Sequence, residues 1–456
     1  MEQVIAFAER NREAFLEGLK AFLCIPSIST DPAHNADVAR CAQFVADELR
    51  RIGLEHVAVM PTPRHPVVYA DWLHAPGKPT VLFYGHYDVQ PVDPVELWTT
   101  APFEPSVRNG QLFARGATDD KGQVFINLKA TEAHLRTTGR LPVNVKLIIE
   151  GEEEIGSPNL DAFIAGHTDL LAADLALVHD STMFRKGLPS ICHGIRGLVY
   201  FQVDVRGTRA DLHSGSFGGS VVNPINALAT MIASLKAADG RITVPGFYDE
   251  VRPLTAAERE AIAGLPFDEG AYREALGAPA LFGEKGYTVL ERLWARPTLD
   301  ANGFRGGWTG PGAKTVIAAT AMAKLSMRLV PNQDPDKIAA LFEAHLRRIC
   351  PPSVELTLTP IPGRARPWLA PVEHPYIQAA ARALEHGFGA RPVFIREGGS
   401  IPVVATFTDV LRLPCVLIGF GLPDCAAHAP DERLDLDCFY GGIRSVAHYY
   451  QELAAA

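Results

Sequence analysis

Long apolar segments and clusters of positive charge are both missing from this chain of 456 residues. No stretch approaches the roughly 18 uninterrupted apolar residues of a membrane helix. The first 23 residues carry charges throughout, without the apolar core and cleavage site of a secretion signal. The net charge is -9, and no Lys/Arg cluster offers a surface for nucleic acid or an anionic membrane. We therefore expect a cytoplasmic protein that acts on small molecules or peptides.

Cysteine is scarce, and its spacing does not suit a structural site. The seven cysteines are scattered without any CxxC pair, so we expect reduced thiols and neither a disulfide framework nor a thiolate zinc site. Several catalytic signatures are also missing: HExxH, the G-x-S-x-G elbow, the GxxxxGK[ST] phosphate loop, and a GxGxxG turn after a strand. These absences argue against the corresponding hydrolase and nucleotide-binding classes.

The pattern of apolar residues predicts an α/β domain with a mostly parallel central sheet. Apolar runs typical of buried strands lie at 80–84, 143–149, 174–178 and 414–420, and an amphipathic helix is expected over 121–136. We also expect one helix within residues 1–23, and another that begins near His374 and is closed by Gly387.

The middle of the chain has a different character. Apolar and polar residues alternate over 199–206 and again over 321–331, which is typical of antiparallel strands with one wet face. Between them Asn223 and Pro224 predict the start of a helix. The Pro-rich segment 360–371 has the composition of a linker. The sequence thus predicts an α/β domain made of 1–193 and 372–456, with an α+β domain, 194–371, inserted into it.

Polar side chains follow the carboxyl ends of the predicted parallel strands, where ligands bind in open α/β sheets. They are His86 and Asp88, the glutamates of "EGEEEIGS" (150–157), His179 and Asp180, and His428, with Asp119 and Asp120 just before the helix at 121.

Imidazoles and carboxylates without thiolates suit one or two divalent cations such as zinc, manganese or cobalt. Asp88 is placed to hold the far nitrogen of His86, as carboxylates often do behind metal-binding histidines. Two adjacent metals need a bridging carboxylate, and their bridging water needs a general base. A glutamate beside a ligand glutamate is suited to that role.

Seven segments, in order along nearly the whole chain, resemble the co-catalytic metallopeptidase family of carnosinase, glutamate carboxypeptidase, aminoacylase, acetylornithine deacetylase and succinyl-diaminopimelate desuccinylase. They are "YGHYDVQPV", "LFARGATDDKGQ", "EGEEEIGS", "DLHSG", "SMRLVPNQ", "REGGSIP" and "AAHAPDE". The resemblance is greatest to the dipeptidase branch. It implies an aminopeptidase-like catalytic domain and an inserted domain that serves as a dimerisation or lid domain.

The resemblance also implies roles for individual residues. One metal, expected to be zinc, would be bound by His86, Asp119 and Asp180, and a second by Asp119, Glu154 and His428. Asp119 would bridge the two, and its peptide bond to Asp120 would be cis. Glu153 would be the general base, Asp88 would orient His86, and Glu150 and Glu152 are left as supporting or surface charge. The segment "VHDSTMF" matches the family only at Asp180, so Asp174 and His179 stay open as alternative ligands.

The resemblance implies that residues of both domains contact the substrate. His213 would stabilise the oxyanion in the partner subunit of a homodimer. Arg328 would clamp the substrate carboxylate, because a planar guanidinium can bind both of its oxygens. Gly399 and Ser400 would form a pocket for the same end of the substrate.

We therefore expect a metal-dependent hydrolase that cleaves the amide bond next to a free carboxylate, with dipeptides or short peptides as substrates. An N-acyl amino acid deacylase is the alternative, because the same activated water would attack the same kind of carbonyl. A non-catalytic metal-binding protein on this fold is a remote third reading.

Overall fold

The computed structural model describes residues 1–399 and 401–456, which form two compact units. The first unit consists of Met1–His193, Ala370–Arg396 and Ile401–Ala456. The second consists of Gly194–Leu369 together with residues 397–399. The segment predicted to be a linker, 360–371, contains the end of one strand and the whole of another, β15 (Trp368–Leu369). The dimerisation or lid role of the second unit stays a prediction.

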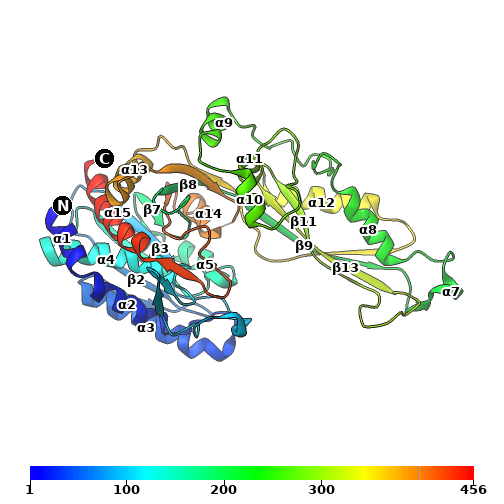
Figure 1. Cartoon of the computed structure of the whole chain (residues 1–456), viewed down its shortest axis with the longest axis horizontal. Coiled ribbons are helices and arrows are strands. Elements are labelled where there is room, and N and C mark those ends of the chain that lie inside the picture. The colour runs from blue at the N-terminus through cyan, green and yellow to red at the C-terminus, as the bar shows by residue number, and fades with distance from the viewer. Residues whose placement is uncertain (400) are drawn as a thin grey trace. The chain divides into compact units, whose positions relative to one another are not determined.

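A nine-stranded sheet, most of whose residues belong to the first unit, contains the predicted parallel strands and forms the core of that unit (Figure 1). Its strands follow the order β1-β2-β6-β3-β7-β17-β8-β15, and β16 also pairs with β8. The four central strands are parallel, whereas the strands that flank them are antiparallel, so the sheet as a whole is mixed. The parallel strands are β6 (Asn144–Glu150), β3 (Thr80–His86), β7 (Leu175–Val178) and β17 (Cys415–Leu417), and the others are β1 (Glu55–Met60), β2 (Val67–Trp72), β8 (Ser190–Ile195), β15 and β16 (Val393–Glu397).

Helix α4 (Lys121–Thr138) runs against β3 and is itself covered by other helices. Every residue from Lys121 to His134 is buried, polar and charged side chains included, so this helix is enclosed on all faces, unlike the amphipathic helix that was predicted. It ends at Gly139, whose positive φ of 68° suits a residue without a Cβ. The helices of this unit are α1 (Glu2–Arg10), α2 (Arg12–Leu23), α3 (Asn35–Ile52), α4, α5 (Leu160–Gly166), α6 (Thr168–Leu171), α13 (Pro375–Phe388), α14 (Pro402–Asp409) and α15 (Leu436–Ala455).

Two details of the predicted helices are wrong. The N-terminal helix is broken at Asn11, whose side-chain amide donates to the carbonyl oxygen of Phe7 at 2.8 Å and so competes with the backbone pattern. Helix α13 is closed by Gly389, which has a φ of 71°, and not by Gly387. Gly387 lies inside the helix, where a Cβ would come within 1.9 Å of the Ser445 Oγ in α15. Its role is close helix packing rather than termination.

An antiparallel sheet with two helices packed on its buried face forms the core of the second unit. The predicted alternation is confirmed, since apolar side chains of β9 and β13 face the core and the polar ones point away. Asn223 caps α8 (Pro224–Ser234) by accepting from the backbone N–H of Ile225 at 2.9 Å. The sheet order is β11 (Thr298–Gly306), β13 (Thr320–Leu329), β9 (Gly197–Arg206) and β14 (Glu355–Pro360), and the second packed helix is α12 (Pro335–Ile349).

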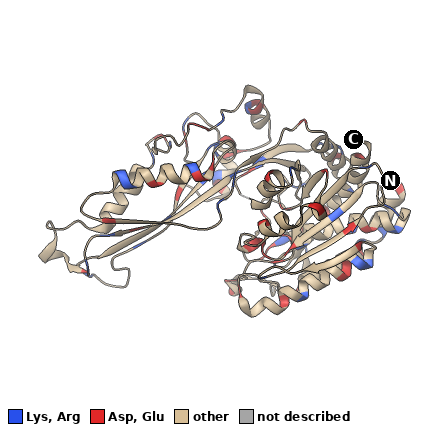
Figure 2. Ribbon diagram, turned by 180° about the vertical axis from the view of Figure 1, so that it is seen from behind, with Lys and Arg blue, Asp and Glu red and all other residues tan. Residues whose placement is uncertain are grey.

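Shorter elements complete the two units. The second unit also contains α7 (Ser214–Phe217), α9 (Ala256–Ala263), α10 (Glu269–Ala275), α11 (Val289–Ala295), β10 (Leu212–His213) and β12 (Val316–Ile317). In the first unit β4 (Ser106–Arg108), β5 (Gln111–Phe113) and β18 (Arg433–Asp435) form a small sheet. Within the described part of the chain, each helix is too short or too polar to cross a membrane. Acidic and basic residues are interspersed along the helices of both units (Figure 2).

Candidate metal centre

The predicted ligands come from the carboxyl edge of the parallel strands. His86 is the last residue of β3 and pairs in register with Glu150, the last residue of β6. Asp180 follows the end of β7, and a short 3-10 helix over Glu153–Ile155 follows β6. Asp119 lies just before α4. Because these elements end at one edge of the sheet, their polar side chains converge.

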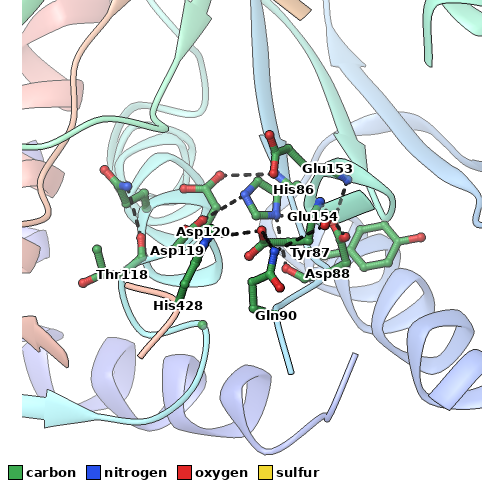
Figure 3. Close-up of polar contacts among 12 residues, drawn as sticks. His86, Tyr87, Asp88, Gln90, Thr118, Asp119, Asp120, Glu153, Glu154 and His428 are labelled. Atoms are coloured by element: carbon green, nitrogen blue, oxygen red, sulfur yellow. Dashed lines mark hydrogen bonds and ion pairs between the residues drawn. The ribbon is translucent and has the colours of Figure 1, made fainter. Parts of the chain in front are cut away.

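Five predicted ligand residues form two groups that share one of them. Ligand atoms of His86, Asp119 and Asp180 lie within 4.8 Å of one another, and so do those of Asp119, Glu154 and His428. The Asp119 Oδ1 atom is 3.1 Å from the His86 Nε2 atom, and Oδ2 is 2.9 Å from the His428 Nε2 atom (Figure 3). The His428 Nε2 atom is also 3.2 Å from the Glu154 Oε2 atom. One carboxylate therefore serves both groups.

The two alternatives to Asp180 are placed elsewhere. The Asp174 Oδ2 atom accepts the backbone N–H of Thr80 at 2.7 Å, at the opposite end of β3 from His86. The His179 ring is fully buried between Phe83 and Phe420, with ring centroids 5.0 Å and 5.3 Å away. Of the three residues, the structure therefore groups Asp180 with His86 and Asp119.

Asp88 contacts both the His86 imidazole and the backbone of the turn that carries Glu153 and Glu154. Its Oδ1 atom lies 3.3 Å from the His86 Nδ1 atom, and its two oxygens accept the backbone N–H groups of Glu153 at 3.2 Å and Glu154 at 3.1 Å. A proton on Nδ1, directed at Asp88, leaves the Nε2 lone pair of His86 available for a cation. The position predicted for Asp88 behind the imidazole is thus the one observed.

Burial and crowding of carboxylates perturb the acid–base properties of the site. Burial, together with the carboxylates of Asp180 and Glu154, raises the pKa of Glu153 well above its usual value. Hydrogen bonds to Asp119 and Glu154 raise the pKa of His428 to about 10. Burial opposes ionisation of Asp119, but hydrogen bonds from His428 and His86 hold the pKa of Asp119 below its usual value. Such a concentration of carboxylates suits the binding of cations.

The donor set fits divalent metal ions. It consists of imidazole nitrogens and carboxylate oxygens, without thiolates among them, from residues that range from the buried His86 to the exposed His428. Zinc, manganese and cobalt accept such ligands. The peptide bond between Asp119 and Asp120 is cis, as the resemblance implied.

The prediction for the remaining glutamates of "EGEEEIGS" was wrong where it allowed surface charge. Glu150 and Glu152 are each only 2% exposed. Glu150 accepts hydrogen bonds from the Tyr84 hydroxyl at 2.6 Å and the Ser157 hydroxyl at 2.8 Å. Glu152 accepts the backbone N–H of His65 at 2.6 Å and the Asn159 amide at 2.8 Å. Both glutamates therefore support the turn from inside.

Sequence reasoning missed three side chains around the site. The Gln90 amide donates to the Glu154 Oε2 atom at 2.8 Å (Figure 3). Glu432 is fully buried and accepts the backbone N–H of Asp119 at 3.0 Å, and Arg115 donates to Glu432 at 2.8 Å. All three lie within segments of the family resemblance, which was the available signal for them.

The predicted substrate-contacting residues belong to the second unit. His213 is exposed at the start of α7, where its Nδ1 atom accepts the backbone N–H of Ser216 at 3.2 Å. Arg328 is half-buried on β13, and burial lowers its pKa. Gly399 accepts the backbone N–H of Arg196 at 3.2 Å, and Ser400 lies outside the described residues. The roles of these residues stay predictions.

Comparison with known proteins is consistent with this geometry. The model of peptidase family M20/M25/M40 matches residues 82–452. The Cys-Gly metallodipeptidase dug1 of Schizosaccharomyces pombe is 33% identical over 100% of this chain and 98% of its own length. The crystal structure of human carnosine dipeptidase 1 superposes with a TM-score of 0.87 at 32% identity, covering 100% of this chain and 99% of that one.

A third relative is named a carboxypeptidase and not a dipeptidase. The metallo-carboxypeptidase Sso-CP2 of Sulfolobus solfataricus superposes with a TM-score of 0.86 at 35% identity, covering 97% of this chain and 99% of that one. The family match spans most of the chain, and these relatives match it from end to end. The chain therefore belongs to peptidase family M20/M25/M40.

Proposed function

We propose that this protein is a di-metal dipeptidase that hydrolyses the amide bond next to a free C-terminal carboxylate. The observation that carries the proposal is the position of Asp119, whose two carboxylate oxygens face the His86 and His428 imidazoles of two ligand groups. His86, Asp119 and Asp180 would hold one ion, and Asp119, Glu154 and His428 the other. Zinc is the expected metal, and manganese and cobalt suit the same donors. When bound, the ions supply Lewis acidity that lowers the pKa of a water molecule and polarises the scissile carbonyl.

Glu153 is the proposed general base. Its raised pKa means that it holds a proton more readily than an exposed glutamate does, which suits a group that must accept a proton and give it back. Glu153 takes the proton from the attacking water and later delivers it to the nitrogen of the departing amine. Asp88 holds the backbone of this residue, because it accepts the backbone N–H of Glu153 while it orients His86.

His213 is the proposed donor to the oxyanion. Its Nδ1 atom accepts the N–H of Ser216, so a neutral His213 ring carries its proton on Nε2. An Nε2–H group on an exposed ring is available to a developing negative charge. In similar dimeric enzymes this histidine acts in the partner's site, so we propose that the protein is a homodimer. Full activity of a monomer would refute this part of the proposal.

Arg328 is the proposed clamp for the substrate carboxylate, with Gly399 and Ser400 beside it. Burial, and secondarily the nearby Arg328 guanidinium, lowers the pKa of Arg196 to about 10, so the two guanidinium groups lie near each other. Two neighbouring guanidinium groups suit a substrate carboxylate. The clamp explains why a free C-terminus would be required.

The relatives favour a peptide over an N-acyl amino acid as the substrate. The dug1 protein is named a Cys-Gly metallodipeptidase, and a relative from Homo sapiens that is 32% identical is named a Beta-Ala-His dipeptidase. We therefore place dipeptides first, with longer peptides as in a carboxypeptidase second. The deacylase activity remains the competing proposal, because it would use the same water and the same general base.

One experiment tests both the metal and the substrate. The protein is freed of metal by chelation and reconstituted with zinc, manganese or cobalt, and elemental analysis gives the stoichiometry. Turnover is then compared for Ala-Ala, for Ala-Ala amide and for N-acetyl-alanine. We expect activity to require metal and to be highest on Ala-Ala. Full activity of the metal-free protein would refute the mechanism, and faster turnover of N-acetyl-alanine would refute the dipeptidase assignment.

A further inference from the structure

Glu432 is a buried carboxylate that no ligand group contains. It is fully buried, and both of its oxygens accept hydrogen bonds. Its Oε1 atom accepts the backbone N–H groups of Thr118 at 2.9 Å and Asp119 at 3.0 Å. Its Oε2 atom accepts the backbone N–H of Gly116 at 3.0 Å and the Arg115 guanidinium at 2.8 Å. One side chain thus binds three backbone N–H groups and one guanidinium of the loop that ends at Asp119.

The same glutamate connects this loop to the segment that carries His428. Glu432 lies four residues after His428 in the sequence. Its own backbone carbonyl oxygen accepts the N–H of Ala114 at 3.1 Å. Next to it, the Thr118 hydroxyl donates to the carbonyl oxygen of Arg433 at 2.6 Å. The segments that carry Asp119 and His428 are distant in the sequence, yet they are joined here through backbone groups on both sides.

Arg115 extends the connection to a third segment. Its guanidinium is 1% exposed and donates to the carbonyl oxygen of Pro91 at 2.9 Å, in the loop that follows Asp88. The ring of Trp98 lies under the guanidinium, with 5.2 Å between the Arg115 Cζ atom and the ring centroid. The Glu432–Arg115 pair therefore touches the loops after β3, before α4 and after β17.

Stability alone is a weak reason for this arrangement. A buried ion pair is costly to desolvate, and apolar residues of similar volume are often as stabilising. A carboxylate that receives three backbone N–H groups does something that apolar packing does not, because it fixes the orientation of the peptide planes that it binds. The last of those planes belongs to Asp119.

We infer that Glu432 is a positioning residue for the metal centre, which acts by fixing the backbone of Asp119 relative to His428 and depends on Arg115 for its own placement. This inference rests on the proposed two-metal function. Residues behind metal ligands tune affinity without touching the metal, and their loss typically weakens metal binding by about 10 to 100-fold.

The test compares Glu432→Gln with Asp424→Asn as a matched control. Asp424 lies in the same segment, but its carboxylate is 69% exposed and pairs with Arg433 at 2.9 Å. Zinc affinity is measured by competition with a chromophoric chelator, and the cobalt-substituted proteins are compared by visible absorption. In Glu432→Gln an amide group must face backbone donors, so we expect zinc binding to weaken by about 10 to 100-fold and the cobalt spectrum to change. Asp424→Asn should bind zinc like the wild type.

Unchanged zinc affinity and an unchanged cobalt spectrum in a folded Glu432→Gln protein would overturn the inference. If that variant fails to fold, Arg115→Lys decides, because one ammonium group replaces the two-armed contact with Glu432 and Pro91. We then expect about tenfold weaker zinc binding, and normal binding would show that Glu432 is structural only. A wild-type protein that binds no divalent metal would instead refute the proposed function, and this inference with it.

Discussion

The Asp119 Oδ2 atom lies 2.9 Å from the His428 Nε2 atom, and the other oxygen of the same carboxylate faces His86 at 3.1 Å. Loss of a bridging carboxylate and loss of a terminal ligand should affect metal binding differently. We expect Asp119→Asn to weaken metal binding at both sites, and His428→Ala to weaken it at one. Calorimetric titration of the metal-free proteins with zinc distinguishes the bridging role from the terminal role. Asp174→Asn is the control, since Asp174 lies at the opposite end of β3.

Loss of only one metal in Asp119→Asn would show that Asp119 is not the bridge. Equal loss in the Asp174→Asn control would point to a general effect of removing a carboxylate from this domain.

Glu153 and Glu154 are neighbours with different expected roles. Glu153→Gln should keep both metals while kcat falls by about 10² to 10⁴-fold, because a general base and its proton transfer are lost. Glu154→Gln should instead weaken one metal site. Steady-state kinetics and elemental analysis on the same preparations provide both readouts. Glu152→Gln is the control, and a larger loss of kcat in that variant would place the base one residue earlier.

Arg328→Met should reduce kcat/KM on dipeptides by about 10 to 100-fold, since a hydrogen bond to a charged partner contributes about 1.5 to 3 kcal/mol. The reason is the lost contact with the substrate carboxylate, so the same substitution should hardly change turnover of a C-terminally amidated dipeptide. Lys324→Met is the matched control, because Lys324 is exposed on the same strand, β13. An equal loss on the free and the amidated substrate would contradict the clamp.

The elements that carry the site could be predicted because their signals are local. Runs such as 80–84 and 143–149 are mostly apolar, which indicates a buried strand, and the polar residues that follow them then lie at the sheet edge. The assignment of Asp119, Glu154 and His428 to one group depended on the family resemblance. No periodicity relates residues that distant in the sequence.

Other features depend on contacts that a local pattern does not contain. Four glutamates within 150–154 look like solvated charge, yet Glu150 and Glu152 are buried because partners from other segments, Tyr84 and His65, meet them. The bonds of Glu432 reach the loop before α4, far back in the sequence. Gly387 resembled a helix stop until its packing partner, Ser445, was known.

Glu150 predicts a pH dependence of stability. Burial raises its pKa to about 7 from an ordinary value of 4.5, despite hydrogen bonds from Tyr84 and Ser157. Between these two values the native state binds more protons than the unfolded state, so the free energy of unfolding falls as the pH rises. The stabilisation is fully present below pH 4.5 and is lost once the pH passes about 7. Since each pKa unit corresponds to about 1.4 kcal/mol, the change is about 3 kcal/mol.

Glu150→Gln should remove this dependence, because a glutamine accepts from Tyr84 and Ser157 and does not titrate. Urea unfolding of the metal-free proteins at several pH values from 4.5 to 8 measures it. Relative to the wild type, the variant should gain about 3 kcal/mol of stability across this range. The exposed Glu104 provides the control. The free energy of unfolding of Glu104→Gln should change with pH as that of the wild type does. If the free energies of unfolding of Glu150→Gln and the wild type changed equally with pH, Glu150 would titrate in the native state as it does in the unfolded chain.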